Sequence, residues 1–302
     1  METVIVLMAT YNGEKYLKEQ LLSILNQTGV KVELVIRDDG STDGTEKIVR
    51  GFMDEFTNIS FISGRNVGSA MNFYELAKHV SGREANFYAF ADQDDIWYED
   101  KLWAGLQLIG NKEKPALYFS ELDLMDAEGN IVGRGINRKS FEVNRRCALV
   151  QNQAAGCTMV FNKKALDILV KHRPVMIQMH DFWMFILMSF LGSIYYDPEA
   201  HMGYRQHGNN VVGADMGLCS RWKSRIRYIK RLKEHPREDM AKELLAGYKD
   251  DLTDEDVELI SKVAYYRQNI RKRLGLLFDR TIHMLDRERD FWYRIRIIFG
   301  DI

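Results

Sequence analysis

Through the first third of the chain, short apolar runs alternate with segments in which apolar residues recur every three to four positions. The short runs predict buried strands over Thr3–Ala9, Val32–Ile36, Ile59–Ser63 and Asn86–Ala91. The helical spacing predicts helices that begin near Glu14 and that cover Glu46–Phe56, the segment from Phe73 to Val80, and Lys101–Ile109. Strands that are apolar throughout and alternate with helices indicate a parallel sheet covered on both faces.

The pattern changes after Pro115. Extended segments are predicted over Ala116–Ser120, Cys157–Phe161, Ser193–Asp197 and Met202–His207, and helices over Lys163–Lys171 and Phe182–Leu191. This order favours a mixed sheet with antiparallel strands, and from Ser220 onward the spacing is helical. We therefore expect an α/β domain over residues 1–217 and a helical C-terminal region over residues 218–302.

Charge is distributed unevenly along the chain. The net charge is only -1, which predicts no overall attraction to nucleic acid. Residues 219–302, however, hold 20 Lys+Arg against 15 Asp+Glu, whereas residues 1–218 hold 22 against 28. The sequence predicts a cytoplasmic protein. Its three cysteines lack metal-ligand spacing, it has no basic leader, and no apolar stretch reaches the ~20 residues that a membrane span needs.

Three carboxylates crowd behind the fourth predicted strand, at Asp92, Asp94 and Asp95. In an extended chain, Asp92 and Asp94 would lie on one side and Asp95 on the other. Paired carboxylates at a strand end suit Mg²⁺ or Mn²⁺, which share their remaining coordination sites with substrate phosphates. The alternative is an acidic turn that caps the next helix, a role that we expect for Asp95.

The segments that follow the first two strands carry the other polar signals. The first, Thr10-Tyr11-Asn12-Gly13, lacks the glycines of a dinucleotide-binding loop, and no Walker-type phosphate loop occurs in the chain. The second, Asp38-Asp39-Gly40-Ser41, has the composition of a strand–turn–helix junction. A carboxylate there also suits the imide N–H of a uracil or thymine ring.

Taken in order, these motifs resemble family 2 glycosyltransferases of the GT-A fold. The resemblance rests on short motifs in the family order over residues 3–212: Val4–Asn12, Leu25–Thr28, Asp38–Asp43, Arg65–Gly68 with Asn72-Phe73, Asp92–Trp97 with Lys101-Leu102, and the later runs Gly156–Met159, His180-Asp181 and Tyr204–Asn210. They are most similar to the branch of bacterial rhamnosyltransferases. The resemblance implies a Rossmann-like nucleotide-sugar-binding domain with a mixed sheet flanked by helices.

The resemblance also implies roles for individual residues. The nucleoside pocket would be lined by Thr10, Tyr11, Asn12 and Asp39, with Arg65 near the diphosphate or ribose. Asp94 would bind Mn²⁺ or Mg²⁺, and Asp92 the ribose or a metal-bound water. Asp38 is the weaker candidate for base contact and is expected to hold the loop.

Residues in the second half complete the predicted site. Sugar transfer needs a base for the acceptor hydroxyl, and Asp181, which opens an apolar helix, suits this role. Arg205 suits bidentate phosphate contact, and the sequence leaves open whether His207 binds the metal or the diphosphate. The acceptor side would include Trp97, Gly156, Thr158 and Trp183, although core packing is an alternative for both tryptophans.

The function expected from this resemblance is inverting, metal-dependent transfer of a sugar from a nucleotide donor to a cell-surface polysaccharide or an undecaprenyl-linked glycan. L-Rhamnose from dTDP-rhamnose is the first expectation. A UDP-hexose transferase is the alternative enzyme, and a catalytically silent nucleotide-sugar-binding module is the alternative from another class.

Residues 220–235 form a basic amphipathic segment, in which seven Lys and Arg are interleaved with apolar residues. Such a helix suits the anionic inner face of the cell membrane. Packing on the body of the protein, or on a second copy in a homodimer, is the alternative.

Overall fold

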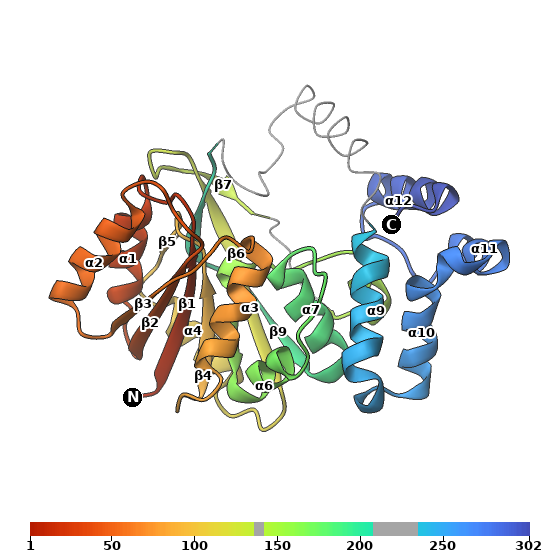
Figure 1. Ribbon diagram of the computed structural model, residues 1–302, viewed down its shortest axis with the longest axis horizontal. Coiled ribbons are helices and arrows are strands. Elements are labelled where there is room, and N and C mark those ends of the chain that lie inside the picture. The colour runs from red at the N-terminus through yellow and green to blue at the C-terminus, as the bar shows by residue number, and fades with distance from the viewer. Residues whose placement is uncertain (136–141, 208–234) are drawn as a thin grey trace. The chain divides into compact units, whose positions relative to one another are not determined.

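The computed structural model describes residues 1–135, 142–207 and 235–302, and these form two compact units (Figure 1). The first unit comprises Met1–Val143, Gln153–His172 and Met179–Arg205. The second comprises Asn144–Asn152, Arg173–Gln178 and Gln206–Ile302. Residues 208–234 lie outside the described ones. The predicted domain boundary at residue 217 and almost all of the predicted basic helix over residues 220–235 fall there, so both stay predictions.

The first unit is built on a mixed sheet. Its described strands are β1 (Thr3–Thr10), β2 (Lys31–Asp38), β3 (Ile59–Ser63), β4 (Phe87–Ala91), β5 (Ile96–Trp97), β6 (Ala116–Met125), β7 (Ile131–Arg134), β8 (Val160–Asn162) and β9 (Ser193–Arg205). They pair in the order β3-β2-β1-β4-β8-β6-β9-β5, with β7 beside β6. The strands β1 to β4 are parallel, whereas β8 runs antiparallel to both β4 and β6. The predictions of a parallel first half and a mixed second half are confirmed.

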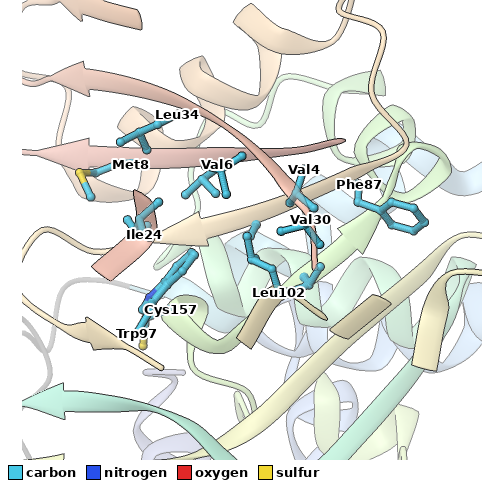
Figure 2. Packing of buried hydrophobic residues seen from close by; sticks show 14 of the residues in the cluster. Val4, Val6, Met8, Ile24, Val30, Leu34, Phe87, Trp97, Leu102 and Cys157 are labelled. Atoms are coloured by element: carbon cyan, nitrogen blue, oxygen red, sulfur yellow. The ribbon is translucent and has the colours of Figure 1, made fainter. Parts of the chain in front are cut away.

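Helices cover both faces of this sheet. They are α1 (Leu17–Leu25), α2 (Thr45–Glu55), α3 (Ser69–Val80), α4 (Lys101–Ile109), α6 (Lys163–Lys171) and α7 (His180–Leu191). Alternate residues of β1 face opposite sides, and Val4, Val6 and Met8 pack with Ile24 of α1 and Leu102 of α4 (Figure 2). On the opposite face, α3 packs against β1 and β2, and Phe73 contacts Phe90 edge-on. Burial on both faces explains why these strands are apolar throughout.

Three of the predicted strands differ from the structure. Residues Gly156–Thr158 form a 3-10 turn, η1, and the strand β8 starts only at Val160. The two extended segments predicted near residues 193–207 are one strand, β9, whose pairing with β6 shifts register near Glu121. The polar stretch in its middle lies at this irregularity, which explains why the pattern suggested two strands.

The second unit is helical. It contains α5 (Arg145–Ala148), α9 (Pro236–Tyr248), η2 (Lys249–Asp251), α10 (Asp254–Ala264), η3 (Tyr266–Gln268), α11 (Ile270–Phe278) and α12 (Arg287–Phe299). Arg145 pairs with the buried Asp256 at 3.0 Å, which joins the short α5 to the start of α10. The helical prediction is confirmed for residues 235–302. Over the described parts of the chain, no helix has the length and apolar content to cross a membrane.

Candidate active site

The turn after β2 is held by Asp38. Its Oδ1 accepts from Thr10 Oγ1 at 2.9 Å, which links the ends of β1 and β2. Its Oδ2 accepts from the amides of Gly40 at 3.1 Å and Ser41 at 2.7 Å. Gly40 has a φ of 85°, in the left-handed region that glycine adopts without strain. These contacts give Asp38 the loop-holding role that the sequence suggested.

Asp39 is also buried and bonded within the chain. Its carboxylate accepts from Arg37 Nη1 at 2.9 Å and from the amides of Val67 at 2.9 Å and Gly68 at 2.8 Å. Arg37 is held in turn by Asn72 Oδ1 at 2.7 Å. An ionised carboxylate offers about four acceptor positions, so a nucleobase would share this group with the loop. The predicted contact between Asp39 and the pyrimidine stays a prediction.

The loop after β1 is bonded both to the loop after β2 and to the loop after β4. Asn12 adopts a φ of 49°, donates its backbone N–H to Ser41 Oγ at 2.8 Å, and accepts from the amide of Thr42 at 2.8 Å. Tyr11 donates its backbone N–H to Gln93 Oε1 at 2.9 Å, and Gln93 Nε2 donates to the carbonyl oxygen of Tyr11 at 3.1 Å. The side chains of Tyr11 and Arg65 are exposed and therefore accessible to a ligand.

The loop of residues 92–95, which we call the acidic loop, bends sharply after β4. Asp92 and Asp94 are partly exposed, whereas Asp95 is fully buried. The bend at residues 93–94 brings a carboxylate oxygen of Asp95, one of Asp92 and the sulfur of Cys157 within 4.8 Å of one another. The prediction that Asp95 points away from Asp92 is therefore wrong, because the chain is not extended here.

Carboxylates from two distant segments act electrostatically on Asp92. Burial is the largest cause that raises the pKa of Asp92 to about 7, and the charges of Asp94 and Asp181 contribute to this rise. Asp181 comes from α7, almost ninety residues along the chain. The charges of Asp94 and Asp181 both disfavour the ionised form of Asp92, so a cation held by Asp92 and Asp94 would relieve this repulsion, and oxygen ligands of this kind suit Mg²⁺ or Mn²⁺. The donor set of Asp92 and Asp94 thus fits the predicted metal.

A buried cation lies next to the acidic loop. Lys101 is fully buried, and its Nζ lies 3.6 Å from the ring centroid of Trp97. Burial lowers the pKa of Lys101 to about 7, while the charges of Cys157 and Asp95 oppose this shift. The helix α4 begins at Lys101 after Asp100, so the predicted capping role of Asp95 is wrong. Asp95 instead lies in a buried cluster with the lysine.

Three polar side chains in α1 or just after its end bind the backbone of residues 92–102, which we call the acidic segment. They are Gln20, Ser23 and Gln27, and we call them the α1 clamp. Their partners are Asp92 O (3.0 Å), Trp97 N (3.0 Å), Tyr98 O (2.6 Å) and Leu102 N (2.9 Å). Our sequence reasoning missed these residues. The available signal was three polar residues at helical spacing directly beside the apolar stripe of α1.

Asp181 lies in the first turn of α7, next to the turn η1. Its Oδ1 accepts from the amide of Phe182 at 2.6 Å and its Oδ2 from the amide of Gly156 at 3.2 Å. His180 is buried and stacks on Phe73 at 3.6 Å. A Cβ at Gly156 would lie 2.5 Å from His180 Nε2 and 3.1 Å from the Cβ of Asp181. Glycine is therefore required at residue 156 for this close approach.

Arg205 is 1% exposed and anchors the acidic loop from β9. Its Nε donates to Asp94 O at 2.9 Å, and its Nη1 donates to Ala127 O at 2.9 Å. Its Nη2 pairs with Glu19 at 2.5 Å, and the guanidinium lies over the ring of Tyr16. A phosphate would compete with these contacts, so the geometry favours an anchoring role over the phosphate contact predicted from the sequence.

The remaining predicted residues fall into two groups. Trp97, Trp183 and Thr158 are buried, and the structure places both tryptophan rings in the core rather than against a sugar. Thr158 donates to Ala155 O at 2.7 Å and helps to form η1. His207 belongs to the second unit, and its contact with the metal or diphosphate stays a prediction.

Comparison with known proteins gives a consistent family. The family model for "Glycosyl transferase family 2" matches residues 5–169. The chain is 33% identical over 229 residues to the dTDP-rhamnosyl transferase RfbG of Shigella flexneri, which covers 72% of this chain and 77% of that protein. It is 29% identical over 166 residues to the UDP-Glc:alpha-D-GlcNAc-diphosphoundecaprenol beta-1,3-glucosyltransferase WfgD of Escherichia coli, over 54% and 62% of the two chains.

Solved structures share the fold at low identity. Residues 1–349 of S. aureus TarS in complex with UDP-GlcNAc match with a TM-score of 0.57 at 17% identity, over 100% of this chain and 93% of that one. The mannosyltransferase PcManGT of Pyrobaculum calidifontis, in complex with GDP-Man and Mn²⁺, matches with a TM-score of 0.52 at 14% identity, over 98% and 87%. At these identities the likeness shows the fold.

Proposed function

Because the chain belongs to glycosyl transferase family 2, we propose that this glycosyltransferase moves L-rhamnose from dTDP-rhamnose to a cell-surface polysaccharide or lipid-linked glycan. It has the GT-A fold expected from its sequence. The similarity of this chain to RfbG, a dTDP-rhamnosyl transferase, extends over most of both chains and supports rhamnose as the donor sugar.

The observation that carries the proposal is the position of Asp92 and Asp94 directly after β4, on the side where Asp181 lies. Asp181 is bonded to the amide of Gly156, and the sulfur of the adjacent Cys157 lies within 4.8 Å of a carboxylate oxygen of Asp92. Ligands of open α/β sheets bind at the carboxyl ends of the strands. Asp94 and Asp92 are the residues that would hold Mn²⁺ or Mg²⁺, with His207 as a further candidate. The metal, when bound, stabilises the negative charge that develops on the leaving nucleoside diphosphate.

The protein's own groups supply the remaining steps. The oxygens of Asp181 accept the backbone N–H groups of Phe182 and Gly156, which orients the carboxylate. Asp181 takes the proton of the acceptor hydroxyl while the oxygen of that hydroxyl attacks the anomeric carbon of the donor sugar. The attack comes from the face opposite the leaving group, which inverts the configuration. Tyr11 and Arg65 have accessible side chains on the loops beside this point and are proposed to contact the nucleotide, with Asn12 and Asp39 holding the loops.

A UDP-hexose donor is the second candidate. It is supported by the similarity to WfgD, a UDP-glucose-dependent transferase, although over a shorter part of the chain. We propose that the acceptor is an undecaprenyl-linked or polysaccharide glycan and that the protein works at the cytoplasmic face of the membrane.

A donor panel tests the function. Purified protein is offered dTDP-rhamnose, UDP-glucose, UDP-galactose and GDP-mannose, with Mn²⁺, with Mg²⁺, or with EDTA, and release of nucleoside diphosphate is measured. We expect turnover of dTDP-rhamnose that depends on the metal. Turnover of a UDP-hexose alone would replace rhamnose in the proposal, and no turnover of any donor would leave the binding-module alternative.

Two variants separate the proposed base from donor binding. Asp181→Asn should lose transfer by roughly 10²-fold or more while it still binds the nucleoside diphosphate with Mn²⁺. Asp54→Asn is the matched control, because Asp54 is an exposed carboxylate on α2. Full activity in Asp181→Asn would exclude Asp181 as the base.

A further inference from the structure

The helix α12 presents apolar residues on its solvent side. Tyr293 and Ile297, four residues apart, are fully buried within the second unit. At 100° per residue, Phe291, Ile298 and Phe299 lie on the opposite side of the helix, and all three are exposed, Phe299 by 76%. A surface helix of a globular protein normally has charged residues on this side.

The neighbouring helix α11 shows the same feature. Ile270, Leu274 and Phe278 lie four residues apart and form an exposed stripe, in which Phe278 is 74% exposed. Arg294 of α12 joins the two helices, because its guanidinium donates to Leu276 O at 3.2 Å and Leu277 O at 3.0 Å. We define the α11–α12 surface by its exposed apolar residues: Ile270, Leu274, Phe278, Leu285, Phe291, Trp292, Ile298 and Phe299.

The exposed charges around these residues are mainly positive. Over residues 270–299 the exposed cations are Arg271, Lys272, Arg280, Arg287 and Arg289, against the exposed carboxylates Asp286 and Glu288. Asp279 and Asp290 are less exposed and pair with Lys262 and Arg294. The surface therefore combines bulky apolar side chains with a net positive charge.

We propose that the α11–α12 surface binds an anionic lipid bilayer, with its aromatic side chains inserted at the headgroup level. Binding of this type depends on buried apolar area and on attraction between Lys or Arg and anionic headgroups, and tryptophan favours the interface. A second copy of the chain would bring the same cations against one another, so charge favours lipid over self-association. The inference goes beyond the proposed sugar transfer and does not depend on the donor.

Co-sedimentation of the full chain with vesicles tests the proposal. We expect binding to vesicles that contain phosphatidylglycerol and weak binding to phosphatidylcholine alone. The triple variant Phe278→Ser, Phe291→Ser, Phe299→Ser should lower the partition coefficient by about tenfold or more, because each phenylalanine supplies apolar area. Since these side chains are exposed, the fold should survive. Met53→Ser, Ile131→Ser, Val132→Ser is the matched control, with exposed apolar residues of the first unit.

Trp292 gives a second readout. Brominated lipid should quench the protein's tryptophan fluorescence, and this quenching should fall in Trp292→Phe but not in Trp103→Phe, although both side chains are 47% exposed. Wild-type vesicle binding by the triple phenylalanine variant would overturn the proposal, as would a lipid-free dimer that this variant disperses. Because donor hydrolysis in solution needs no lipid, it should be unchanged in the triple variant, which separates this proposal from the proposed function.

Discussion

Replacement of Arg205 by methionine should destabilise the first unit. Two bonds from the charged guanidinium to the carbonyls of Asp94 and Ala127 are lost, each worth about 1.5–3 kcal/mol. Glu19 is 58% exposed at its side chain, so solvent screening limits that ion pair to at most about 1 kcal/mol. Methionine keeps part of the packing on Tyr16. We therefore expect a net loss of about 3–5 kcal/mol in the free energy of unfolding.

The assay is urea or thermal unfolding followed by circular dichroism. A loss of this size lowers the melting temperature of a unit of this size by about 10 °C. Glu19→Gln is the control, because it removes only the screened partner and should cost at most about 1 kcal/mol. Binding of nucleoside diphosphate is measured well below the transition. An Arg205→Met protein of wild-type stability that binds nucleotide at least about tenfold more weakly would refute the anchoring role and restore the phosphate contact.

Three further predictions address the acidic loop and the turn beside it. Asp94→Asn should remove most of the activity and its dependence on Mn²⁺. Isothermal titration calorimetry should show that the variant binds Mn²⁺ at least about tenfold more weakly, and an unchanged affinity would place the metal elsewhere. In the metal-free protein, the pKa of Asp92 is raised from 3.8 to about 7, so the folded state binds more protons than the unfolded state between these values, and stability should fall as the pH rises through this window. Asp92→Asn should flatten this slope in thermal unfolding, and an unchanged slope would assign it to other groups. Gly156→Ala should cost about 1–3 kcal/mol and reduce transfer, because the added methyl meets buried His180 and displaces Asp181; a fully active and stable variant would show that η1 adjusts freely.

The regular elements of the first unit were predictable because their apolar periodicity is strong. The strands β1 to β4 and the helices between them lie close to the predicted ranges, since residues buried on both faces leave long apolar runs in the sequence. β5 and β7 were missed. β5 has only two residues, and β7 lies at the surface, where burial does not impose a pattern.

Within the candidate site, the residues involved were easier to predict than the positions of their side chains. The sequence indicated that Asp92, Asp94 and Asp181 belong together, which the electrostatic coupling at Asp92 supports. It did not indicate that Asp95 turns back toward Asp92, since alternation assumes an extended chain and the loop bends. The burial of Arg205 was hidden for a related reason: its partners lie on segments 78 to 186 residues away in the sequence.

The α1 clamp has a consequence for local opening of the protein. The amide of Trp97 is bonded to Ser23 of α1, and that of Leu102 to Gln27, two residues after the end of α1, rather than to a neighbouring strand. They become free to exchange with solvent deuterium only when α1 moves or the acidic segment detaches from it. The helix and the segment should thus open as one cooperative unit, and a ligand that holds the acidic segment closed should slow amide exchange along α1, a helix that it need not touch.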